Sequence, residues 1–416
     1  MKESIKKRIE AVRRGEVPTG YVVTAAGTLP SDWSSAPLRE ISEVLSEQAG
    51  DREFETLSIS AGIGFVNQAE KFGKELSGRQ YAKYIVLRRG DFAYNKGNSK
   101  RYPQGCTYML REREEAAVPN VFECFRITEG HPEYYEQLFI NGFMNKQLTR
   151  KINHGVRDDG LLNLTDEDFY STVLPVPLVA EQQKIAEILA TCDRVIELKQ
   201  QLLEEKRLQK KWLMQKLLDP NSGLRLPGFE GEWCTGSFSD VCTFVNGRAY
   251  KQDELLEEGK YPVLRVGNLF TKSDWYYSDM ELPVHMYIDN GDLIYAWSAS
   301  FGPQIWAGEK VIFHYHIWKV LLSDVVCKQY LYQYFLYDVE QLSREQQGGT
   351  MAHITKESME KRVCRYPTVA EQRRIAEVLD AADREVTLAE NDVELWQQKK
   401  KALMQLLLTG LVRVNA

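Results

Sequence analysis

The sequence lacks the features that would place it in several common classes of protein. No apolar run approaches the 18 or so residues that a membrane-spanning helix requires. The first 16 residues carry charges but no apolar stretch, so we expect no secretory signal. The seven cysteines are dispersed and form no C-x-x-C pair. This pattern argues against a structural zinc site and is typical of reduced thiols, which favours a cytoplasmic protein.

Motifs for catalysis are also missing. The chain has no G-x-x-x-x-G-K-[ST] loop and no Asn/Asp-Pro-Pro-aromatic tetrad, which adenine methylation would need around a flipped base. The G-x-G in Ser60–Phe65 has no third glycine in register and is interpreted as a turn. His314-Tyr315-His316 could suggest a metal pair, but no carboxylate or cysteine neighbours it, so packing or DNA contact is favoured. We therefore expect neither a catalytic residue nor a metal in this chain.

The chain has no excess of positive charge. Its formal net charge is −6 and its pI about 5.7. Nucleic-acid binders usually carry a basic surface, so these values argue mildly against that class. Binding requires only a local positive face, however, and net charge averages such a face away.

What the sequence does contain is an internal repeat. "VAEQQKIAEIL" begins at Val179 and "VAEQRRIAEVL" at Val369. One offset of 190 positions relates the two copies without a gap from Pro177 to Leu218, and about half of the aligned positions are identical. Neither copy has an internal Gly or Pro. Each copy therefore predicts one long helix, about 60 Å in length.

The apolar positions of each copy recur with a spacing of four, three, four, three, which is a heptad seam interrupted by lysines. Thr368 and Glu371 also predict a capping box for the second helix. An ordinary amphipathic core helix is the simpler alternative, but two matching seams in one chain favour an intrachain antiparallel coiled coil. The seam and leading polar positions that we expect to form this pair or to bind partners are Glu181, Gln182, Ile185, Leu189, Ile196, Leu203, Leu213, Glu371, Gln372, Ile375, Leu379, Val386, Val393 and Leu403.

The segments outside the repeats share weaker landmarks. "LRRGDFAY" from Leu87 resembles "IDNGDLIY" from Ile288, and "FECFRI" from Phe122 resembles "FHYHIWKV" from Phe313. Alternating runs at 261–269 and 311–320 predict strands, whereas 132–148 and 327–342 predict helices. Each segment is therefore expected to be an α/β (α+β) globule of one type, in the order globule, helix, globule, helix.

The expected boundaries are an N-terminal helical segment at 1–30, a first globule at 31–176, a central helical region at 177–219, a second globule at 220–366 and a C-terminal helical region at 367–416. The helix predicted near the N-terminus would lie beside the end of the last helix, in a circular organisation; a loose basic tail is the alternative. Antiparallel helices would relate the globules by a pseudo-two-fold. Such a pair can read two half-sites on DNA, with the helices acting as a ruler.

This arrangement, with "LVAEQQKIAEIL…LMQKLL" and "TVAEQRRIAEVL…LMQLLLTG", resembles the specificity subunit of type I restriction–modification systems. "FVNGRAYKQ" and "YPVLRVGNL" in the second globule also look like that family's target recognition domains. The resemblance implies a non-catalytic DNA reader of an asymmetric, bipartite site. It implies partners as well: double-stranded DNA, two methyltransferase (modification) subunits docked on the helices, and restriction (translocase/nuclease) subunits. S-adenosylmethionine, ATP and Mg would be used by those partners and not by this chain.

Residues that would contact DNA are sought among Lys, Arg, small polar and aromatic side chains in loops. In the first globule the best segment is "NKGNSKRYPQG" from Asn95, with a solvated loop as the alternative; the second globule offers fewer basic residues. The predicted contacts are Tyr94, Lys96, Asn98, Lys100, Arg101 and Arg157 in the first globule, and Arg248, Lys251, Arg265, Asn268, Trp297, Ser298, Ser300 and Gln304, with Lys272 as a weaker candidate, in the second.

Two other functions stay open at this point. A coiled-coil scaffold whose globules bind protein or glycan would fit the low pI. A self-sufficient modification enzyme would need the catalytic motifs that the sequence lacks. Duplex competition at two salt concentrations separates the first from a DNA reader, and a methyl-transfer assay on the isolated chain tests the second.

Overall fold

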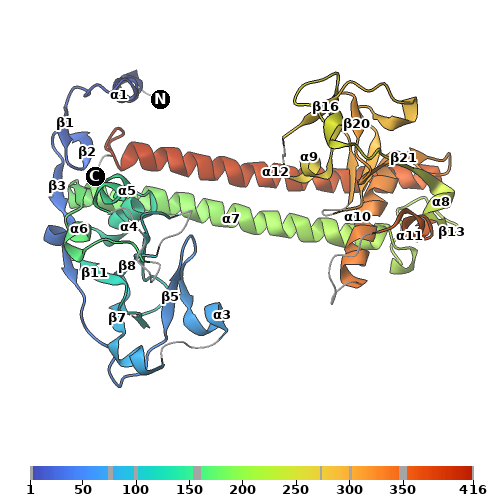
Figure 1. Cartoon of the computed structure of the whole chain (residues 1–416). Coiled ribbons are helices and arrows are strands. Elements are labelled where there is room, and N and C mark those ends of the chain that lie inside the picture. Colours follow the sequence, from blue (N-terminus) through green and yellow to red (C-terminus); the bar gives the residue numbers. More distant parts are fainter. Residues whose placement is uncertain are drawn as a thin grey trace. The chain divides into compact units, whose positions relative to one another are not determined.

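The computed structural model describes residues 3–73, 78–97, 102–152, 161–271, 274–298, 302–345 and 354–414. The chain divides into two compact units. Unit 1 comprises residues 1–199 and 392–416, and unit 2 comprises residues 200–391. Each unit thus contains one globule together with part of each long helix (Figure 1).

The long helices are α7 (Val179–Leu217) and α12 (Val369–Leu407), and each has 39 residues. They begin after Pro177 and Pro367, as predicted. Their segments pack antiparallel: in unit 1 Lys199 pairs with Asp392 at 2.6 Å and Asp193 with Lys400 at 2.6 Å. In unit 2 Lys210 pairs with Asp383, the counterpart of Asp193–Lys400 at the offset of 190. The predicted antiparallel intrachain coiled coil is confirmed.

The globule of unit 1 is an α+β fold around a four-stranded antiparallel sheet of order β4-β11-β8-β9. Two-stranded pairs β5-β6, β7-β10 and β3-β12 lie outside this sheet. The elements are β3 (Ser34–Pro37), α2 (Leu38–Ile41), β4 (Ser42–Val44), β5 (Leu57–Ser60), β6 (Gly64–Asn67), α3 (Gln68–Phe72), η1 (Gly78–Lys83), β7 (Ile85–Arg88), β8 (Phe92–Asn95), β9 (Cys106–Met109), β10 (Glu115–Val118), β11 (Glu123–Ile127), α4 (Pro132–Ile140), α5 (Asn145–Lys151), α6 (Asp166–Tyr170) and β12 (Val173–Val176).

The globule of unit 2 repeats this plan with a sheet of order β14-β21-β18-β19 and a pair β13-β22. It differs by a second four-stranded sheet, β16-β15-β20-β17, in which β15 and β20 are parallel. The elements are η2 (Pro220–Ser222), β13 (Cys234–Ser237), α8 (Phe238–Val241), β14 (Cys242–Asn246), η3 (Gln252–Glu254), β15 (Tyr261–Leu264), α9 (Val266–Phe270), β16 (Tyr276–Ser278), η4 (Val284–Met286), β17 (Tyr287–Ile288), β18 (Leu293–Ala296), β19 (Gly302–Ile305), β20 (Val311–Phe313), β21 (Ile317–Leu322), α10 (Lys328–Glu345), α11 (Lys356–Glu360) and β22 (Val363–Tyr366).

Three predicted elements are divided in the structure. The strand expected at 261–269 ends at Leu264, and α9 follows it. The strand expected at 311–320 is broken by a turn at His314–His316 into β20 and β21. The helix expected at 132–148 is split into α4 and α5. The turn at His314–His316 is not evident from local pattern, because its N–H groups donate to the distant carbonyls of Leu264 and Arg248. The break between α4 and α5 is local, since the N–H groups around it donate to carbonyls a few residues back and Gly142 has φ +66°.

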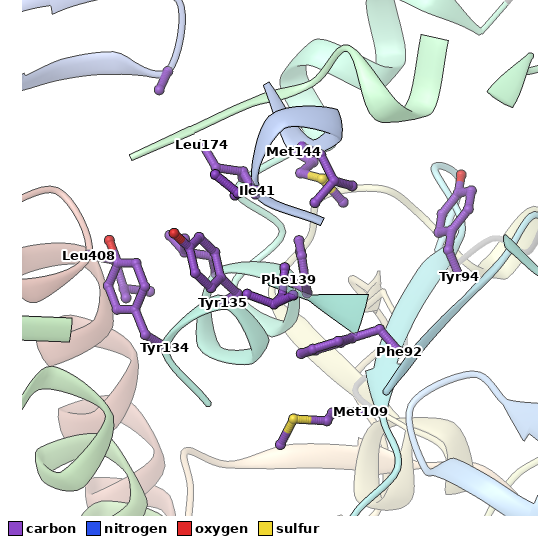
Figure 2. Close-up of a cluster of buried hydrophobic side chains, with 14 of the residues drawn as sticks. Ile41, Phe92, Tyr94, Met109, Tyr134, Tyr135, Phe139, Met144, Leu174 and Leu408 are labelled. Carbon is purple, nitrogen blue, oxygen red and sulfur yellow. The ribbon is translucent and has the colours of Figure 1, made fainter. Parts of the chain in front are cut away.

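The core of unit 1 joins the globule to the long helices. Aromatic rings of β8, β11 and α4 share one cluster with Ile185 and Leu189 of α7 and with Leu407 and Leu408 at the end of α12. Figure 2 shows part of this cluster, with Phe92, Tyr134, Tyr135 and Phe139 around its centre. Unit 2 contains the equivalent cluster, in which Met214 and Leu217 of α7 and Ile375 and Leu379 of α12 pack on α8 and α10. Each globule is therefore anchored on both helices.

The N-terminal segment is only partly helical. α1 (Glu3–Arg13) is followed by a hairpin of β1 (Tyr21–Thr24) and β2 (Gly27–Pro30), so the prediction of a helical segment over 1–30 is corrected. Tyr21 Oη donates a 2.6 Å hydrogen bond to the carbonyl of Gly410. Gly410 has φ +67°, and a Cβ there would lie 2.4 Å from Cγ of Pro30. The chain beyond α12 therefore packs against the N-terminal hairpin.

Candidate nucleic-acid interface

In unit 1, the predicted DNA-binding loop begins at the end of β8. Asn98, Lys100, Arg101 and, further along, Arg157 lie outside the described residues. Tyr94 is 1% exposed, its ring stacks on Phe169 at 4.4 Å and its hydroxyl donates to the carbonyl of Gln104. Tyr94 is therefore corrected from a DNA contact to a residue of the buried cluster (Figure 2).

Lys96 is also part of the structure of the globule. Its ammonium lies 2.6 Å from Glu123 and 2.9 Å from Asp166, and its side chain is 13% exposed. Burial alone would lower the pKa of Lys96, but the hydrogen bonds to these two carboxylates outweigh burial and raise it. A charge compensated twice by neighbours is less available to a phosphate, and the contact of Lys96 with DNA stays a prediction.

Helix α5 presents basic residues that the sequence analysis did not select. Lys146 and Arg150 are four residues apart and both exposed, so they share one face of α5. Neither forms an ion pair with a carboxylate of the described part of the chain. Thr149 of the same helix accepts a 3.0 Å hydrogen bond from Gln104 of the loop. The signal in the sequence was "NKQLTRK", in which the basic residues recur at helical spacing.

In unit 2, Arg248 and Lys251 follow β14. Both terminal nitrogens of Arg248 donate to Glu254 at 2.8 Å, and its guanidinium lies 5.3 Å from the ring centroid of Tyr250. The hydrogen bonds from Arg248 lower the pKa of Glu254 to about 2. Lys251 is exposed, and its ammonium forms no ion pair with any carboxylate in the described ranges. Lys251 thus retains its predicted availability to a phosphate, whereas the charge of Arg248 is compensated.

Arg265 and Asn268 form the start of α9. The side-chain oxygen of Asn268 accepts from the backbone N–H of Arg265 at 3.0 Å, so it closes the first turn of this short helix. The guanidinium of Arg265 donates to the carbonyl of Asp274 and lies 4.3 Å from the ring centroid of Tyr276. The structure gives both residues a local structural role, and their predicted contact with DNA stays a prediction.

The loop after β18 carries the remaining predicted contacts. Trp297 is half-buried and donates from Nε1 to the carbonyl of Tyr315 at 2.8 Å. Ser298 is 9% exposed, which leaves little surface for a ligand. Gln304 is half-buried on β19, opposite Ile294. Ser300 and Lys272 lie outside the described residues.

The leading Glu-Gln pairs of the repeat are buried at the starts of the long helices, and a role for them in partner binding stays a prediction. Glu181 accepts from Arg413 at 2.8 Å and from the indole of Trp33 at 3.0 Å. Gln182 accepts from the backbone N–H of His131 at 2.8 Å and donates to the carbonyl of Pro177. Both side chains therefore join the first globule to the start of α7.

The same junction recurs in unit 2. Glu371 accepts from Arg225 at 2.7 and 3.0 Å, and Gln372 accepts from the backbone N–H of Cys327 and donates to the carbonyls of Val325 and Pro367. The expected capping box is formed only in part: the Glu371 N–H reaches Thr368 Oγ1 at 3.5 Å, while its carboxylate binds Arg225. In both units an arginine from beyond the end of one long helix binds the buried glutamate at the start of the other.

The predicted apolar seam is confirmed as a packing surface. Ile185, Leu189, Ile375 and Leu379 are at most 1% exposed and belong to the globule cores, and Leu203 is 9% exposed. The remaining seam positions are half-buried: Ile196, Leu213, Val386, Val393 and Leu403. The lysines that interrupt the seam are neutralised by acidic residues of the opposite helix, among them Lys206 by Glu385 at 2.7 Å.

The described residues offer little for cofactor chemistry. No group of three His, Cys, Asp or Glu is placed to hold a metal among the residues that the structure describes. A cavity of about 720 Å³ in unit 1 is lined by β9, α4 and the long helices. Its charged walls include the pairs Arg111–Glu136 and Asp193–Lys400, so they are compensated internally. None of the described helices is long and apolar enough to cross a membrane.

The fold and the two junctions define a class of protein with paired globules on a shared antiparallel coiled coil. The family of the type I restriction modification DNA specificity domain matches residues 127–205 and 230–394, more than half of the chain. The chain therefore belongs to this family.

Two relatives from Methanocaldococcus jannaschii support the assignment. The type I restriction enzyme MjaX specificity subunit is 23% identical over 94% of this chain and 96% of its own length. The MjaVIII specificity subunit is 23% identical over 62% of this chain and 66% of its own. Among solved structures, a chain from a study of complex assembly and conformational transition of the type I R-M system has a TM-score of 0.61 at 19% identity, covering 92% of this chain and 99% of that one. The type I S subunit from M. genitalium has a TM-score of 0.51 at 13% identity, covering 90% and 96%.

Membership of the family settles the class of function. The chain is a DNA specificity subunit of the type I restriction–modification kind, with recognition and not catalysis as its role. The two alternatives, a protein- or glycan-binding scaffold and a self-sufficient modification enzyme, are thereby disfavoured. Membership of this family implies DNA and the modification and restriction subunits as partners.

Proposed function

We propose that this chain reads an asymmetric, bipartite DNA site, with one globule on each half. The observation that carries the proposal is that both units use the same junction but carry different surfaces. Glu181–Arg413 in unit 1 corresponds to Glu371–Arg225 in unit 2, and Gln182 corresponds to Gln372. Two unlike surfaces on one repeated scaffold are suited to two unlike sequences.

The candidate reading surfaces differ in chemistry. The face of α5 in unit 1 carries Lys146 and Arg150 next to the loop that contains Gln104. The globule of unit 2 is less basic and offers Lys251 together with aromatic rings near Trp297. Because base edges are distinguished by donor and acceptor pattern, we infer that the two half-sites have different sequences.

The long helices are proposed to set the spacing between the half-sites. At about 1.5 Å per residue, 39 residues extend for about 58 Å. Interhelical ion pairs occur along their length, as in Lys199–Asp392 and Arg207–Glu390. These pairs oppose sliding of one helix along the other, because a shift of one turn would break them.

Two modification subunits are proposed to dock on the helices. Leu198 of α7 and Leu388 of α12 are related by the offset of 190, and they are 47% and 66% exposed. Exposed apolar side chains that form a patch mark a contact for another protein, and Leu198 has the exposed Leu202 one turn further along α7. Each unit thus offers an equivalent apolar position, which favours two equivalent partner copies. Restriction subunits would join this assembly in the cytoplasm, and S-adenosylmethionine, ATP and Mg would be bound by the partners.

The test is to map adenine methylation in a genome that encodes the cognate modification subunits, with and without this chain. We expect one two-part motif to appear only when the chain is present. A variant lacking residues of the second globule is avoided, because α7 and α12 would lose their packing. The proposal would be contradicted if methylation did not depend on the chain, or if the methylated motif were one continuous sequence without a spacer.

A further inference from the structure

The turn between β20 and β21 in unit 2 is held rigidly by its neighbours. The N–H of His314 donates to the carbonyl of Leu264 at 2.9 Å, and the N–H of Tyr315 donates to the carbonyl of Arg248 at 3.1 Å. Gly247 packs so closely that a Cβ there would lie 2.4 Å from the carbonyl oxygen of His314. Backbone contacts from two other segments therefore fix the direction of the three rings of His314, Tyr315 and His316.

These three rings continue an aromatic column that begins in the core. Trp318 stacks on Tyr295 below and on Trp297 above, each at 5.9 Å between centroids. Trp297 lies 5.1 Å from the ring of His316, and His316 lies 3.9 Å from the ring of Tyr315. The column runs from the buried Trp318, which is 1% exposed, to Tyr315, which is 38% exposed.

Ordinary packing does not account for the outer end of this column. A packing role would bury the rings, whereas Tyr315 is exposed and is held from the backbone side by Arg248 and Trp297. A metal site is not supported, because no group of His, Cys, Asp and Glu suited to a metal exists among the described residues. Flat rings beside basic residues are instead the groups that contact nucleic-acid bases.

The histidine at the start of the turn can act as a neutral hydrogen-bonding group. Burial, together with the nearby His316 and Arg265, lowers the pKa of His314 to about 4. The other groups facing it are the rings of Tyr250 and Tyr315, at 6.4 and 4.4 Å, and Arg248 beyond Tyr250. A neutral imidazole has one donor and one acceptor, which allows it to read a base edge without binding a phosphate.

We propose that the turn His314–His316, together with Trp297, is the base-contacting surface of the second globule and determines the half-site that this globule reads. The proposal rests on the proposed function, because it takes the occupant to be duplex DNA. Lys251, which follows Arg248 in the neighbouring segment, would contribute phosphate contacts.

The experiment uses the complete complex of this chain with its modification subunits. Tyr315→Ala and His314→Gln are compared with Leu321→Ala, a control on strand β21, which follows the turn. Leu321 is 43% exposed but lies six positions along the chain from Tyr315, about 20 Å in an extended strand. Methylated sites are mapped in the genome for each variant, and affinity for the mapped site is measured in a salt titration.

We expect the two turn variants to relax the sequence of one half of the motif and leave the other half unchanged. Affinity for the intact site should fall by roughly 5- to 150-fold, the range for loss of a specific base contact. The slope of affinity against salt should stay at the wild-type value, because neutral rings release no counterions. Leu321→Ala should retain the wild-type motif and affinity.

Two results would overturn the inference. One is an unchanged motif with affinity within about twofold of wild type in both turn variants. The other is equal relaxation or loss of both halves, which would indicate a structural role for the turn. Failure of the proposed function is distinguishable, because then the wild-type chain itself would direct no two-part motif.

Discussion

Arg413→Ala is expected to destabilise unit 1 through the junction at the start of α7. The side chain of Glu181 is 4% exposed, and both of its oxygens accept from Arg413 at 2.8 Å. The hydrogen bonds that Arg413 donates to Glu181 raise the pKa of Arg413, burial opposes that shift, and Asp32 adds to it. Removing the guanidinium leaves a buried carboxylate with the Trp33 indole as its remaining side-chain donor among the described residues.

The expected loss in the free energy of unfolding follows from this geometry. Removing one partner of a buried ion pair costs about 3–5 kcal/mol. The side chain of Arg413 is 34% exposed, so water can reach the vacated space, and we discount the loss to about 2–3 kcal/mol. Glu181→Gln in the Arg413→Ala background should recover part of this loss, because the uncompensated charge is then removed.

The assay is urea unfolding followed by circular dichroism, with all four members of the double-mutant cycle. Arg194→Ala is the control, since Arg194 lies on α7 in the same unit, is 62% exposed and forms a surface ion pair with Glu197. Its effect should stay below about 0.5 kcal/mol. If Arg413→Ala were as mild as Arg194→Ala, or if the cycle gave no coupling, the reasoning about the buried junction would be refuted.

Three further predictions concern other parts of the chain. Arg248 lowers the pKa of the Glu254 carboxyl to about 2, so this group should stabilise the fold above its unfolded pKa of 4.5, and that stability should be lost as the pH falls toward 2. In the Arg248→Met variant the NMR titration midpoint of Glu254 should rise toward 4.5. An unchanged midpoint would show that Arg248 is not the cause of the lowered pKa. Lys210 and Lys400 occupy equivalent positions, and their side chains are 19% and 12% exposed. Lys210→Ala and Lys400→Ala should each lower the free energy of unfolding in urea by about 1–2 kcal/mol. Very unequal losses would argue against equivalent packing of the two residues. Leu198→Asp and Leu388→Asp should change the free energy of unfolding by less than about 0.5 kcal/mol, because both side chains are exposed. Both variants should bind the modification subunits more weakly in gel filtration. If both bound them as the wild type does, the docking surface would lie elsewhere.

The long helices could be predicted from the sequence because their signal is local. Absence of Gly and Pro, the heptad spacing and the preceding prolines each act within a few residues. The sequence shows that lysines interrupt the seam, but it does not show which acidic residues pair with them. Lys210 pairs with Asp383 and Lys199 with Asp392, and these pairs follow only once the antiparallel register is known.

The candidate DNA-binding residues were harder to assess, because a sequence shows which side chains are charged but not which neighbours neutralise them. Lys96 looked available in its loop, yet Glu123 and Asp166, which neutralise it, come from β11 and α6. Tyr94 lies on the buried face of β8, and its ring stacks on Phe169 of α6, a contact that the sequence does not reveal. Lys146 and Arg150 were overlooked because the predicted helix ended at Leu148, so the two were not recognised as neighbours on the separate helix α5.

The repeated junction explains how the two globules can differ while the scaffold stays the same. The polar contacts that the two junctions share involve the repeated Glu-Gln pair, an arginine from beyond the other helix and backbone groups next to α4 or α10. The candidate reading residues, Lys146 and Arg150 in one globule and the turn at Tyr315 in the other, take no part in these contacts. Substitutions at the reading surfaces therefore leave the junctions intact, so the sequence that is read can change without loss of the spacing that the helices set.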